Sequence, residues 1–483
     1  MRHQITLMPQ QVNMEADHGS NLLQVLRSAG VLMDAPCGGN GRCGKCRVLV
    51  DGVETLACQT PVCQDMTVTL PQRQPMEILT QGVEYPNPDS KGYALAFDIG
   101  TTTLAGFLLF GGRQIGQISR PNPQAAYGAD VVSRIQGALK GEMDRLTGLI
   151  REGLTEMTLT LCRSANITAV EIATVCIVGN PAMQQIFLGI LPENLAKIPF
   201  APVLTQGAVW AAKEHLPCCE NAKLLIVPNI SGFVGADTVA CVLATKLDQE
   251  EALTLLVDIG TNGEMVLGDR HQMVACSTAA GPALEGGNIS CGMPARPGAI
   301  DHVWLEKGKF QWSVIGGGQA LGICGSGLVD AVAAALDAGM LNKRGKILAE
   351  NGIIPLADGI FLTQEDIRQV QLTKGAIAAG IRLMAAHLGV SLEQIEQVYL
   401  AGAFGSFLRK ASACRIGLLP PVLEAKIQAV GNGAGSGAQW IAADESMLAR
   451  AQQIREQTEY LDLATHPRFP REFAKMMMFE VEG

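Results

Sequence analysis

Four cysteines near the start of the 483-residue chain have a spacing that suits a redox centre. Cys37, Cys43, Cys46 and Cys58 follow the pattern Cx5Cx2Cx11C, although the whole chain holds only 14 cysteines. A [2Fe–2S] cluster needs four thiolates that converge on two irons, and its sulfides accept hydrogen bonds from backbone N–H groups. The glycines between these cysteines permit the backbone torsions that such a loop requires. The spacing therefore predicts a [2Fe–2S] cluster.

Two alternatives to this ligand set stay open. Zinc ribbons carry two short cysteine pairs about 15–20 residues apart, whereas this chain has a triplet and a distant single cysteine, so zinc is the second interpretation. Cys63 lies five residues after Cys58 and competes with it as the fourth ligand. Among the other cysteines, the vicinal pair Cys218–Cys219 is a minor redox candidate. Four lie in apolar context and are expected to be buried, namely Cys176, Cys241, Cys276 and Cys324.

A second chemical signal is a strand–turn sequence that occurs twice. The chain reads ALAFDIGTTT at 94–103 and LLVDIGTNGE at 255–264, each at the end of an apolar run. Glycine lets a backbone approach a phosphate, and threonine hydroxyls and N–H groups donate to it. A carboxylate at the strand end can hold Mg²⁺ through water or orient an attacking water. Two unrelated structural turns are the alternative, but the repetition favours a nucleotide site built around Asp98 and Asp258.

Composition limits the kinds of protein to which these residues can belong. The chain is 48% hydrophobic and 17% charged with 54 glycines, which excludes a largely disordered protein and predicts many tight turns. Its net charge is 37 − 46 = −9, which argues against a broad nucleic-acid-binding surface. No signal peptide and no apolar run of membrane-spanning length stands out, so we expect a cytoplasmic protein without a membrane anchor.

The elements that must position these residues follow from periodicity and turn composition. Near the start, strands are expected at 4–7, 47–50 and 67–70 and a helix at 21–29 with Ser20 as N-cap. Strands and helices then alternate from residue 93, including a helix at 363–377 with Thr363 as N-cap. The expected organisation is a small domain at 1–72, a Pro-rich linker at 73–92, two related α/β halves at about 93–250 and 251–465 around a cleft, and a loosely docked tail at 466–483.

Both motif sets resemble known families. The cysteine segment resembles the β-grasp plant-type ferredoxins, with five residues instead of four in the first gap, and LACQT around Cys58 resembles the setting of their fourth ligand. The repeated turns resemble the ASKHA superfamily of sugar kinases, heat-shock chaperones and actin, in which two ribonuclease-H-like halves bind ATP. The resemblance implies an α/β multi-domain fold: an N-terminal β-grasp [2Fe–2S] ferredoxin-like domain followed by a two-lobed ASKHA domain.

The ASKHA resemblance assigns roles to individual residues. It makes Asp98 and Asp258 the catalytic candidates, and it makes residues 400–405 (LAGAFG) resemble the adenosine motif. The nucleotide-binding candidates that it implies are Gly100, Thr101, Thr102, Thr103, Gly260, Thr261, Asn262, Gly263, Gly402, Ala403 and Gly405. Glu264 and Glu285 are further candidates for the cleft.

The combination of the two domains resembles the reductive activators of corrinoid proteins. Members of that family are ATP-dependent activases that return cob(II)alamin to cob(I)alamin for methyl transfer. Stretches with the same resemblance lie at 127–134 (YGADVVSR), 276–287, 292–300 and 363–377. The resemblance implies a [2Fe–2S] cluster, ATP and Mg²⁺ as cofactors. It implies as partners a corrinoid protein of a methyltransferase system and a low-potential electron donor, and it is compatible with a homodimer.

One departure and three rival functions accompany this interpretation. Asp98 follows the linker directly, so the extra middle domain of many family members is expected to be absent. An activator of a radical dehydratase would use the same parts on another partner. A small-molecule kinase would use the same cleft with a regulatory cluster, and a redox-sensing switch would bind nucleotide without reducing a partner.

Overall fold

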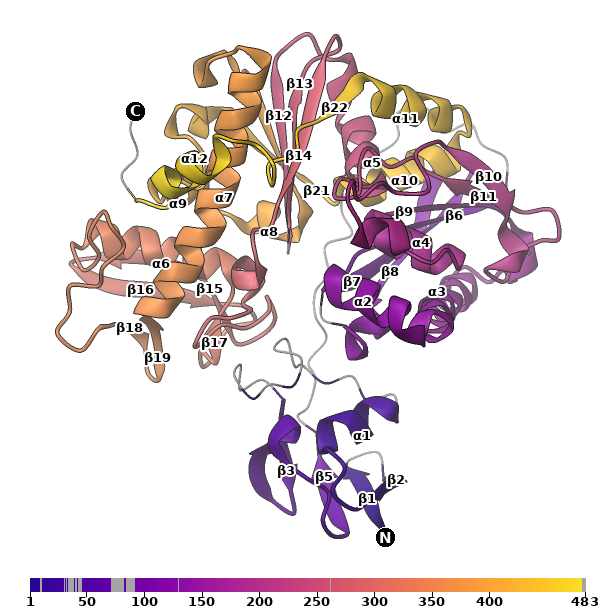
Figure 1. Cartoon of the computed structure of the whole chain (residues 1–483), viewed down its shortest axis with the longest axis horizontal. Coiled ribbons are helices and arrows are strands. Elements are labelled where there is room, and N and C mark those ends of the chain that lie inside the picture. Colours follow the sequence, from indigo (N-terminus) through magenta and orange to yellow (C-terminus); the bar gives the residue numbers. More distant parts are fainter. Residues whose placement is uncertain are drawn as a thin grey trace.

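The structure is a computed structural model of the whole chain. It describes residues 1–8, 11–29, 31, 33, 39, 41, 46–70, 82–83, 92–128, 130–260 and 262–479. Within this part a small N-terminal domain precedes two larger α/β halves, and the three lie at separate places in the molecule (Figure 1). None of the helices in these ranges has the length and apolarity needed to cross a membrane.

The N-terminal domain is a mixed five-stranded sheet in the order β2-β1-β5-β3-β4, with one helix against it. Its elements are β1 (Arg2–Met8), β2 (Val12–Asp17), α1 (Leu22–Ser28), β3 (Arg47–Val50), β4 (Val53–Leu56) and β5 (Met66–Thr69). The N-cap of α1 is Asn21, whose side chain accepts from the N–H of Gln24, so the predicted cap at Ser20 was wrong by one residue. The buried side chains Leu22, Leu26 and Val68 join helix and sheet into one core.

The first half is built on a six-stranded sheet in the order β10-β11-β9-β6-β7-β8. Its strands are β6 (Tyr93–Ile99), β7 (Thr103–Phe110), β8 (Arg113–Pro121), β9 (Ile172–Gly179), β10 (Ala208–Ala211) and β11 (Lys223–Ile226). Its outer helices are α2 (Val131–Gly137), α3 (Met143–Ser164) and α4 (Pro181–Leu188). Leu146, Ile150, Leu154 and Leu161 recur at helical spacing on α3 and are buried against the sheet.

The second half repeats this sheet. Its order is β21-β20-β12-β13-β14-β22, in strands β12 (Thr254–Ile259), β13 (Gly263–Gly268), β14 (Met273–Thr278), β20 (Gln397–Ala401), β21 (Ile427–Gly431) and β22 (Thr458–Tyr460). Strand β12 pairs antiparallel with β13 and parallel with β20, as β6 pairs with β7 and β9. The two halves therefore share the five-strand series β11-β9-β6-β7-β8 and β21-β20-β12-β13-β14.

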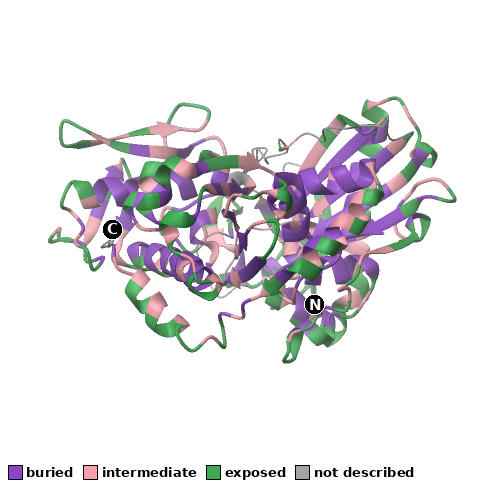
Figure 2. Ribbon diagram, turned by 90° about the horizontal axis from the view of Figure 1, so that it is seen from above, coloured by how far each residue is buried: buried purple, intermediate pink, exposed green. Residues whose placement is uncertain are grey.

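Two helices join the halves through a common core. Helices α5 (Ala236–Thr245) and α10 (Gly433–Ala443) pack against each other, and α11 (Ser446–Gln457) packs beside α5. One buried cluster includes Phe107 of the first half, Val266 of the second half and Trp440 of α10. Figure 2 shows the buried segments of both halves as purple, with exposed loops around the rim. The halves thus rest on one hydrophobic core, and the carboxyl ends of β6 and β12 both point toward their junction.

The second half also carries a large insertion and the C-terminal segment. The further elements are η8 (Pro282–Glu285), β15 (Ala299–Glu306), β16 (Lys309–Val314), β17 (Gly322–Ile323), α6 (Gly325–Asp337), β18 (Ile353–Ala357), β19 (Ile360–Thr363), α7 (Gln364–Leu388), η9 (Leu392–Gln394), α8 (Gly402–Phe407), α9 (Lys410–Arg415), η10 (Pro421–Lys426) and α12 (Phe469–Met476). Thr363 is the N-cap of α7 as predicted, with Asp366 completing a capping box, and the helix ends at the left-handed Gly389.

The segment after His466 is not the loosely docked tail that the sequence predicted. Helix α12 packs along α7, and the rings of Phe469 and Phe473 stack with centroids 5.7 Å apart. Gln371 of α7 donates from its side chain to the carbonyl of Met477 at 2.8 Å. Side-chain hydrogen bonds to backbone carbonyls hold this end of the chain against α7, and composition alone did not predict them.

Candidate functional site

The first repeated turn, residues 100–102, joins β6 to β7 and is tied down by side chains from elsewhere. The amide of Asn122 donates to the carbonyl of Gly100 at 2.8 Å, and the backbone N–H of Asn122 donates to the carbonyl of Thr102 at 2.9 Å. The hydroxyl of Thr101 accepts from Asn180, which is the N-cap of α4, at 3.1 Å. A Cβ at Gly100 would lie 2.6 Å from the carbonyl oxygen of Thr103, so this close turn requires glycine.

Arg134 lies beneath the same turn and explains the YGADVVSR stretch. Its side chain is fully buried and donates to the carbonyls of Thr101 and Gly128. Asp130 is the N-cap of α2 and forms a capping box with Ser133, which fixes the helix from which Arg134 extends. Burial lowers the pKa of the Arg134 guanidinium to about 10. Arg134 therefore puts a positive charge directly under the first turn.

The second repeated turn joins β12 to β13 in the same way. Asp258 pairs with Glu264 across the hairpin, and the N–H of Gly260 donates to the carbonyl of Asn262 at 2.9 Å. A Cβ at Gly263 would meet the hydroxyl of Thr278 at 2.9 Å. The candidate Thr261 lies outside the described residues. The predicted repeat is thus two β-hairpins, one in each half, whose pairing differs by one residue: Asp98 lies opposite Ala105, whereas Asp258 lies opposite Glu264.

Four carboxyl groups converge where the halves meet, and we call this set the acidic junction: Asp98, Asp237, Asp258 and Glu264. Burial, Asp237 and Asp258 raise the pKa of Asp98 to about 7, although a hydrogen bond from Asn432 opposes them. Burial and Asp237 raise the pKa of Asp258 to about 7, and burial raises the pKa of Asp237 itself to about 6. Burial, Asp237 and Asp258 raise the pKa of Glu264 well above its usual value.

This concentration of repelling carboxylates fits a cation. A divalent ion would relieve the repulsion and favour the ionised forms. Among the described residues no three histidine, cysteine, aspartate or glutamate side chains are arranged to ligate a metal directly. The acidic junction therefore suits a hydrated ion that also contacts phosphate.

Sequence reasoning named three of these carboxylates, Asp98, Asp258 and Glu264, and missed the partners that lie on helices. Asp237 lies in the first turn of α5, and Asn432 is the N-cap of α10. The amide nitrogen of Asn432 donates to Asp98 at 3.1 Å, from 334 residues away in the chain. The available signal was a Gly or Pro close to a polar residue at the start of a helix. It occurs in VGNPA at 178–182, GAD at 235–237 and GNG at 431–433.

The predicted Gly402–Gly405 turn is instead the start of helix α8, and its first residue comes to the second hairpin. Gly402 follows β20 with φ +82, and a Cβ on it would lie 2.8 Å from Oδ1 of Asp258. A Cβ on Gly405 would lie 3.0 Å from the side chain of Leu400. Glu285 also approaches the second turn, since its Oε1 lies 3.9 Å from the position of a Cβ on Gly260. Of the adenosine candidates, the side chain of Ala403 lies outside what the structure describes.

The N-terminal domain brings two of the predicted cluster ligands together. Cys46 and Cys58 are 1% and 5% exposed, and the N–H of Ala57 donates to the carbonyl of Cys46 at 2.8 Å, which aligns the two positions. Gly39 and Gly41 have φ of +92 and +74, a backbone conformation that favours glycine, and a Cβ on Gly39 would lie 3.2 Å from Leu23 and 3.7 Å from Cys58. Two buried thiols beside glycines with these torsions fit a cluster.

The remaining cysteines differ in their exposure to solvent. Cys37 and Cys43 lie outside the described residues. Cys63 is exposed to solvent, which favours Cys58 as the fourth ligand. The four cysteines predicted to be buried are buried: Cys176, Cys241, Cys276 and Cys324. Burial raises the pKa of Cys218 to about 11, so this thiol is a poor nucleophile and the vicinal pair gains no support as a redox site.

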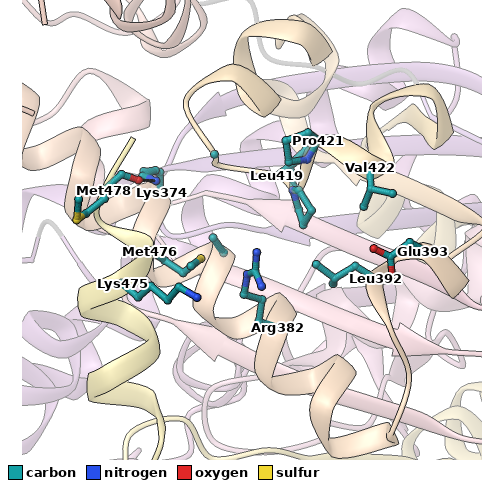
Figure 3. Close-up of a pocket in the computed structure, with 13 residues that line it drawn as sticks. Lys374, Arg382, Leu392, Glu393, Leu419, Pro421, Val422, Lys475, Met476 and Met478 are labelled. Carbon is teal, nitrogen blue, oxygen red and sulfur yellow. Dashed lines mark hydrogen bonds between the residues drawn. The ribbon is translucent and has the colours of Figure 1, made fainter. Parts of the chain in front are cut away.

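A cavity of about 200 Å³ lies away from the two hairpins, between α7, the segment 417–422 and α12 (Figure 3). Arg382 and Lys475 extend toward its centre, with Leu392 and Glu393 opposite. Lys374 donates to the carbonyl of Met478, so its charge already has an acceptor. This cavity contains no residue of the acidic junction and plays no part in the site.

Comparisons with known proteins cover almost the whole chain. Residues 5–63 match a family model of 2Fe-2S iron-sulfur cluster binding domains. Residues 93–250 match a model described as the RACo middle region, and residues 252–483 match the C-terminal domain of RACo, the ASKHA domain. The expected absence of a middle region was therefore wrong, because the segment that directly follows the linker matches it. The expected fold class is confirmed by these matches.

Three relatives define the similarity further. The corrinoid activation enzyme RamQ of Eubacterium limosum is 34% identical over 418 residues, which cover 80% of this chain and 70% of that protein. The Co(II) methylated amine-specific corrinoid protein reductase of Methanosarcina barkeri is 28% identical over 392 residues, 74% of this chain and 71% of that one. A solved reductive activator for corrinoid, iron-sulfur protein matches with a TM-score of 0.72 at 27% identity, over 99% of this chain and 98% of that one.

Proposed function

The chain belongs to the RACo family, and we propose that it reductively activates a corrinoid protein at the expense of ATP. One electron passes from the N-terminal [2Fe–2S] centre to cob(II)alamin on the partner, which becomes cob(I)alamin for methyl transfer. The observation that carries this proposal is that one chain contains both the buried cysteines Cys46 and Cys58, which we call the cysteine cradle, and two hairpins that resemble phosphate-binding turns. A kinase with the same hairpins would have no use for the cradle.

In this proposal the N-terminal domain holds the electron carrier. A bound [2Fe–2S] cluster supplies one electron. Cys37, Cys43, Cys46 and Cys58 are its ligands, and Gly39 and Gly41, which have positive φ, lie between the first two of them. Nothing about Cys58 except its burial and neighbours distinguishes it from Cys63, so these two positions form the natural test of the ligand set.

We propose that the two hairpins grip the nucleotide phosphates from opposite sides. Gly100 to Thr103 would donate backbone N–H groups and hydroxyls on one side, and Gly260 to Gly263 on the other. Asp98 and Asp258 would hold a hydrated Mg²⁺ and orient the attacking water. The turn at Gly402, Ala403 and Gly405 would receive the adenosine.

ATP is needed because the electron moves uphill from an ordinary cellular donor. For one electron about 59 mV corresponds to a factor of ten, so a gap of roughly 200 mV costs on the order of 5 kcal/mol. A nucleotide that binds one arrangement of the two halves more tightly than another can supply a free energy of that size. Rotation of the halves about their shared helices α5 and α10 would bring the partner and the cluster domain together.

The acidic junction gives this step a proton dependence. With pKa values of about 7, Asp98 and Asp258 are partly protonated near neutral pH. Binding of Mg²⁺ favours the ionised carboxylates, so Mg-ATP binding should release protons and strengthen as pH rises from 6 to 8.

Anaerobic visible spectroscopy tests the function. The protein, a low-potential reductant, Mg-ATP and a candidate cob(II)alamin protein should yield the cobalt(I) spectrum, and the yield should collapse without nucleotide and in Asp258→Asn. Cobalt(I) that forms equally fast without ATP would refute the coupling, and reduction of a dehydratase in place of a corrinoid would support the nearest rival.

The cluster is tested separately. Cys58→Ala should lose the visible absorption of the [2Fe–2S] centre, whereas Cys63→Ala should keep it, since only Cys58 is buried against the glycine loop. The opposite pattern would reassign the fourth ligand. We expect the protein to work in the cytoplasm with a soluble low-potential electron donor, and ultracentrifugation would decide between a monomer and a homodimer.

A further inference from the structure

A short piece of the Pro-rich linker is bonded to the ATP-binding part of the chain. The N–H of Val83 donates to the hydroxyl of Ser436 at 2.8 Å, and the carbonyl of Val83 accepts from the indole N–H of Trp440 at 3.1 Å. The side chain of Val83 packs against the core that the two halves share. Both backbone groups of one linker residue are therefore satisfied by helix α10.

The same face of α10 reaches the first hairpin. Asn432, Ser436 and Trp440 are spaced four residues apart, so they form one stripe along the helix. Asn432 caps α10 through Oδ1 and donates through Nδ2 to Asp98, and its carbonyl accepts from the hydroxyl of Ser436 at 2.9 Å. A single stripe thus binds the linker at one end and a carboxylate of the acidic junction at the other.

Gly82 makes the contact between linker and stripe direct. A Cβ on Gly82 would lie 2.0 Å from the hydroxyl of Ser436 and 2.7 Å from the carbonyl oxygen of Asn432. The second of these atoms belongs to the backbone, so it cannot rotate away. Gly82 is therefore required by its contact with the residue that holds Asp98.

We propose that Gly82 and Val83 form an anchor that couples the cluster domain to the nucleotide site, with Asn432 as the positioning residue between them. A change at Asp98 on nucleotide binding moves Asn432, and the linker follows because it is bonded to the same stripe. By reciprocity, a pull on the linker when the cluster domain docks on a partner changes nucleotide affinity. The biological use of this anchor rests on the proposed function, whereas the coupling between linker and nucleotide site does not depend on that function.

The anchor also shortens the tether of the cluster domain. From Leu70, the last described residue of that domain, the chain runs 82 − 70 = 12 residues to the anchor, against 92 − 70 = 22 residues to the start of the first half. Effective concentration falls roughly as the −3/2 power of tether length, so release of the anchor lowers it about 2.5-fold. The anchor therefore keeps the electron carrier close to the junction of the halves.

The test compares Gly82→Ala with Gly148→Ala in the full-length protein. Both add one methyl group, but a Cβ at Gly148 on α3 meets no atom within 4 Å. Hydrogen exchange of the peptide that contains Val83 should accelerate about tenfold in Gly82→Ala, as expected for the loss of about 1.4 kcal/mol of local hydrogen bonding, and stay unchanged in Gly148→Ala. Val83→Pro, which removes the N–H donor, should reproduce the activity effects of Gly82→Ala.

Two further readouts separate coupling from folding. In the wild type a non-hydrolysable ATP analogue with Mg²⁺ should change the exchange of the Val83 peptide, and in Asn432→Ser it should not. ATP hydrolysis without partner should stay within about 1.5-fold in Gly82→Ala, while ATP-dependent cobalt(I) formation falls about 2.5-fold or more.

Each failure points to one cause. Fast exchange of Val83 in the wild type, or exchange that ignores the nucleotide, overturns the anchor whatever the partner is. Absence of cobalt(I) in the wild type with a nucleotide-sensitive Val83 overturns the proposed function and leaves the anchor standing.

Discussion

The two hairpins where the halves meet have the same arrangement of neighbouring strands and differ in what surrounds them. Asp98 and Asp258 occupy the same position, one residue before the last residue of β6 and of β12, and each strand pairs with a parallel neighbour on its other side. The first hairpin is held by side chains from three other segments: Asn122, Arg134 and Asn180. Gly402 lies beside the second hairpin and has no side chain.

This difference arises just after the parallel strands β9 and β20, where the register makes Gly179 the counterpart of Gly402 and Asn180 the residue that follows it. Asn180 follows β9 and caps α4, whereas Gly402 follows β20 and opens α8. In the first half the side chain of Asn180 bonds to Thr101, and in the second half a hydrogen atom faces Asp258. Side chains thus fix the first hairpin, whereas the Gly402 side of the second hairpin is open, and we propose that this open side receives the rest of the nucleotide.

Filling the open side should have the largest effect. Gly402→Val places a branched side chain within reach of Asp258 at a left-handed φ, and we expect it to weaken binding of a non-hydrolysable ATP analogue about 100-fold by calorimetry. Gly389→Ala is the control for backbone strain, because Gly389 has φ +69 with no atom within 4 Å of a Cβ. If Gly402→Val bound the analogue with an affinity within threefold of the wild type, the nucleotide would not lie on this side of the second hairpin.

Loosening the fixed side should cost less. Arg134→Met removes a buried guanidinium that holds the carbonyl of Thr101 and supplies positive charge beneath the turn, so analogue affinity should fall about tenfold, a loss of about 1.4 kcal/mol. Arg134→Lys keeps the charge but not the fork, and should recover part of the affinity. Thermal unfolding of each variant separates weakened binding from a weakened fold, and unchanged binding in Arg134→Met would mean that the first turn needs no support.

The sequence predicted the parts of the site that are local. Asp98 and Asp258 lie two residues before their own glycines and near the ends of their own apolar strands, so a window of ten residues contains the end of each strand and the turn that follows. The same holds for Thr363, whose capping partner Asp366 lies three residues away. Elements of this kind could be placed from pattern alone.

The missing parts depend on distant contacts. Asp237 and Asn432 start helices that look ordinary in sequence, and only the packing of α5 against α10 brings them to Asp98. The docking of α12 was missed for a similar reason, since Gln371 hydrogen-bonds to a backbone carbonyl 106 residues later, which carries no sequence signature. Fold class followed from repeated local patterns, whereas the acidic junction required the tertiary structure.

Removing the support of Asp98 should shift a pH profile without abolishing activity. The hydrogen bond from Asn432 favours the ionised carboxylate, so its loss in Asn432→Ser should raise the pKa of Asp98 further above its usual value, while serine still caps α10. The acid limb of ATP hydrolysis against pH should then move upward by about half a unit to one unit. Asn180→Ser leaves the hydrogen bond from Asn432 to Asp98 unchanged, so it should leave the acid limb in place. An equal shift of the acid limb in both variants would refute this role of Asn432.

The smallest effect should come from relieving the repulsion between the carboxyl groups that lie beside the two hairpins. The carboxyl groups of Asp98, Asp237 and Asp258 have pKa values raised to about 7, 6 and 7, so without nucleotide their folded forms bind protons more tightly than the unfolded chain. Their protonated forms favour folding below the unfolded pKa near 4, and this stability is lost as pH rises through 6 to 7. Asp237→Asn removes one of these groups and its repulsion on both hairpins. It should raise Tm by about 2–4 °C at pH 8 and by about half as much at pH 5, where the unfolded carboxyl is already ionised but the folded one is still protonated. Asp358→Asn, on an exposed turn, should change neither value. A gain of equal size at both pH values would assign the effect to packing around α5, and the two hairpins would then be coupled by the shared core instead of by charge.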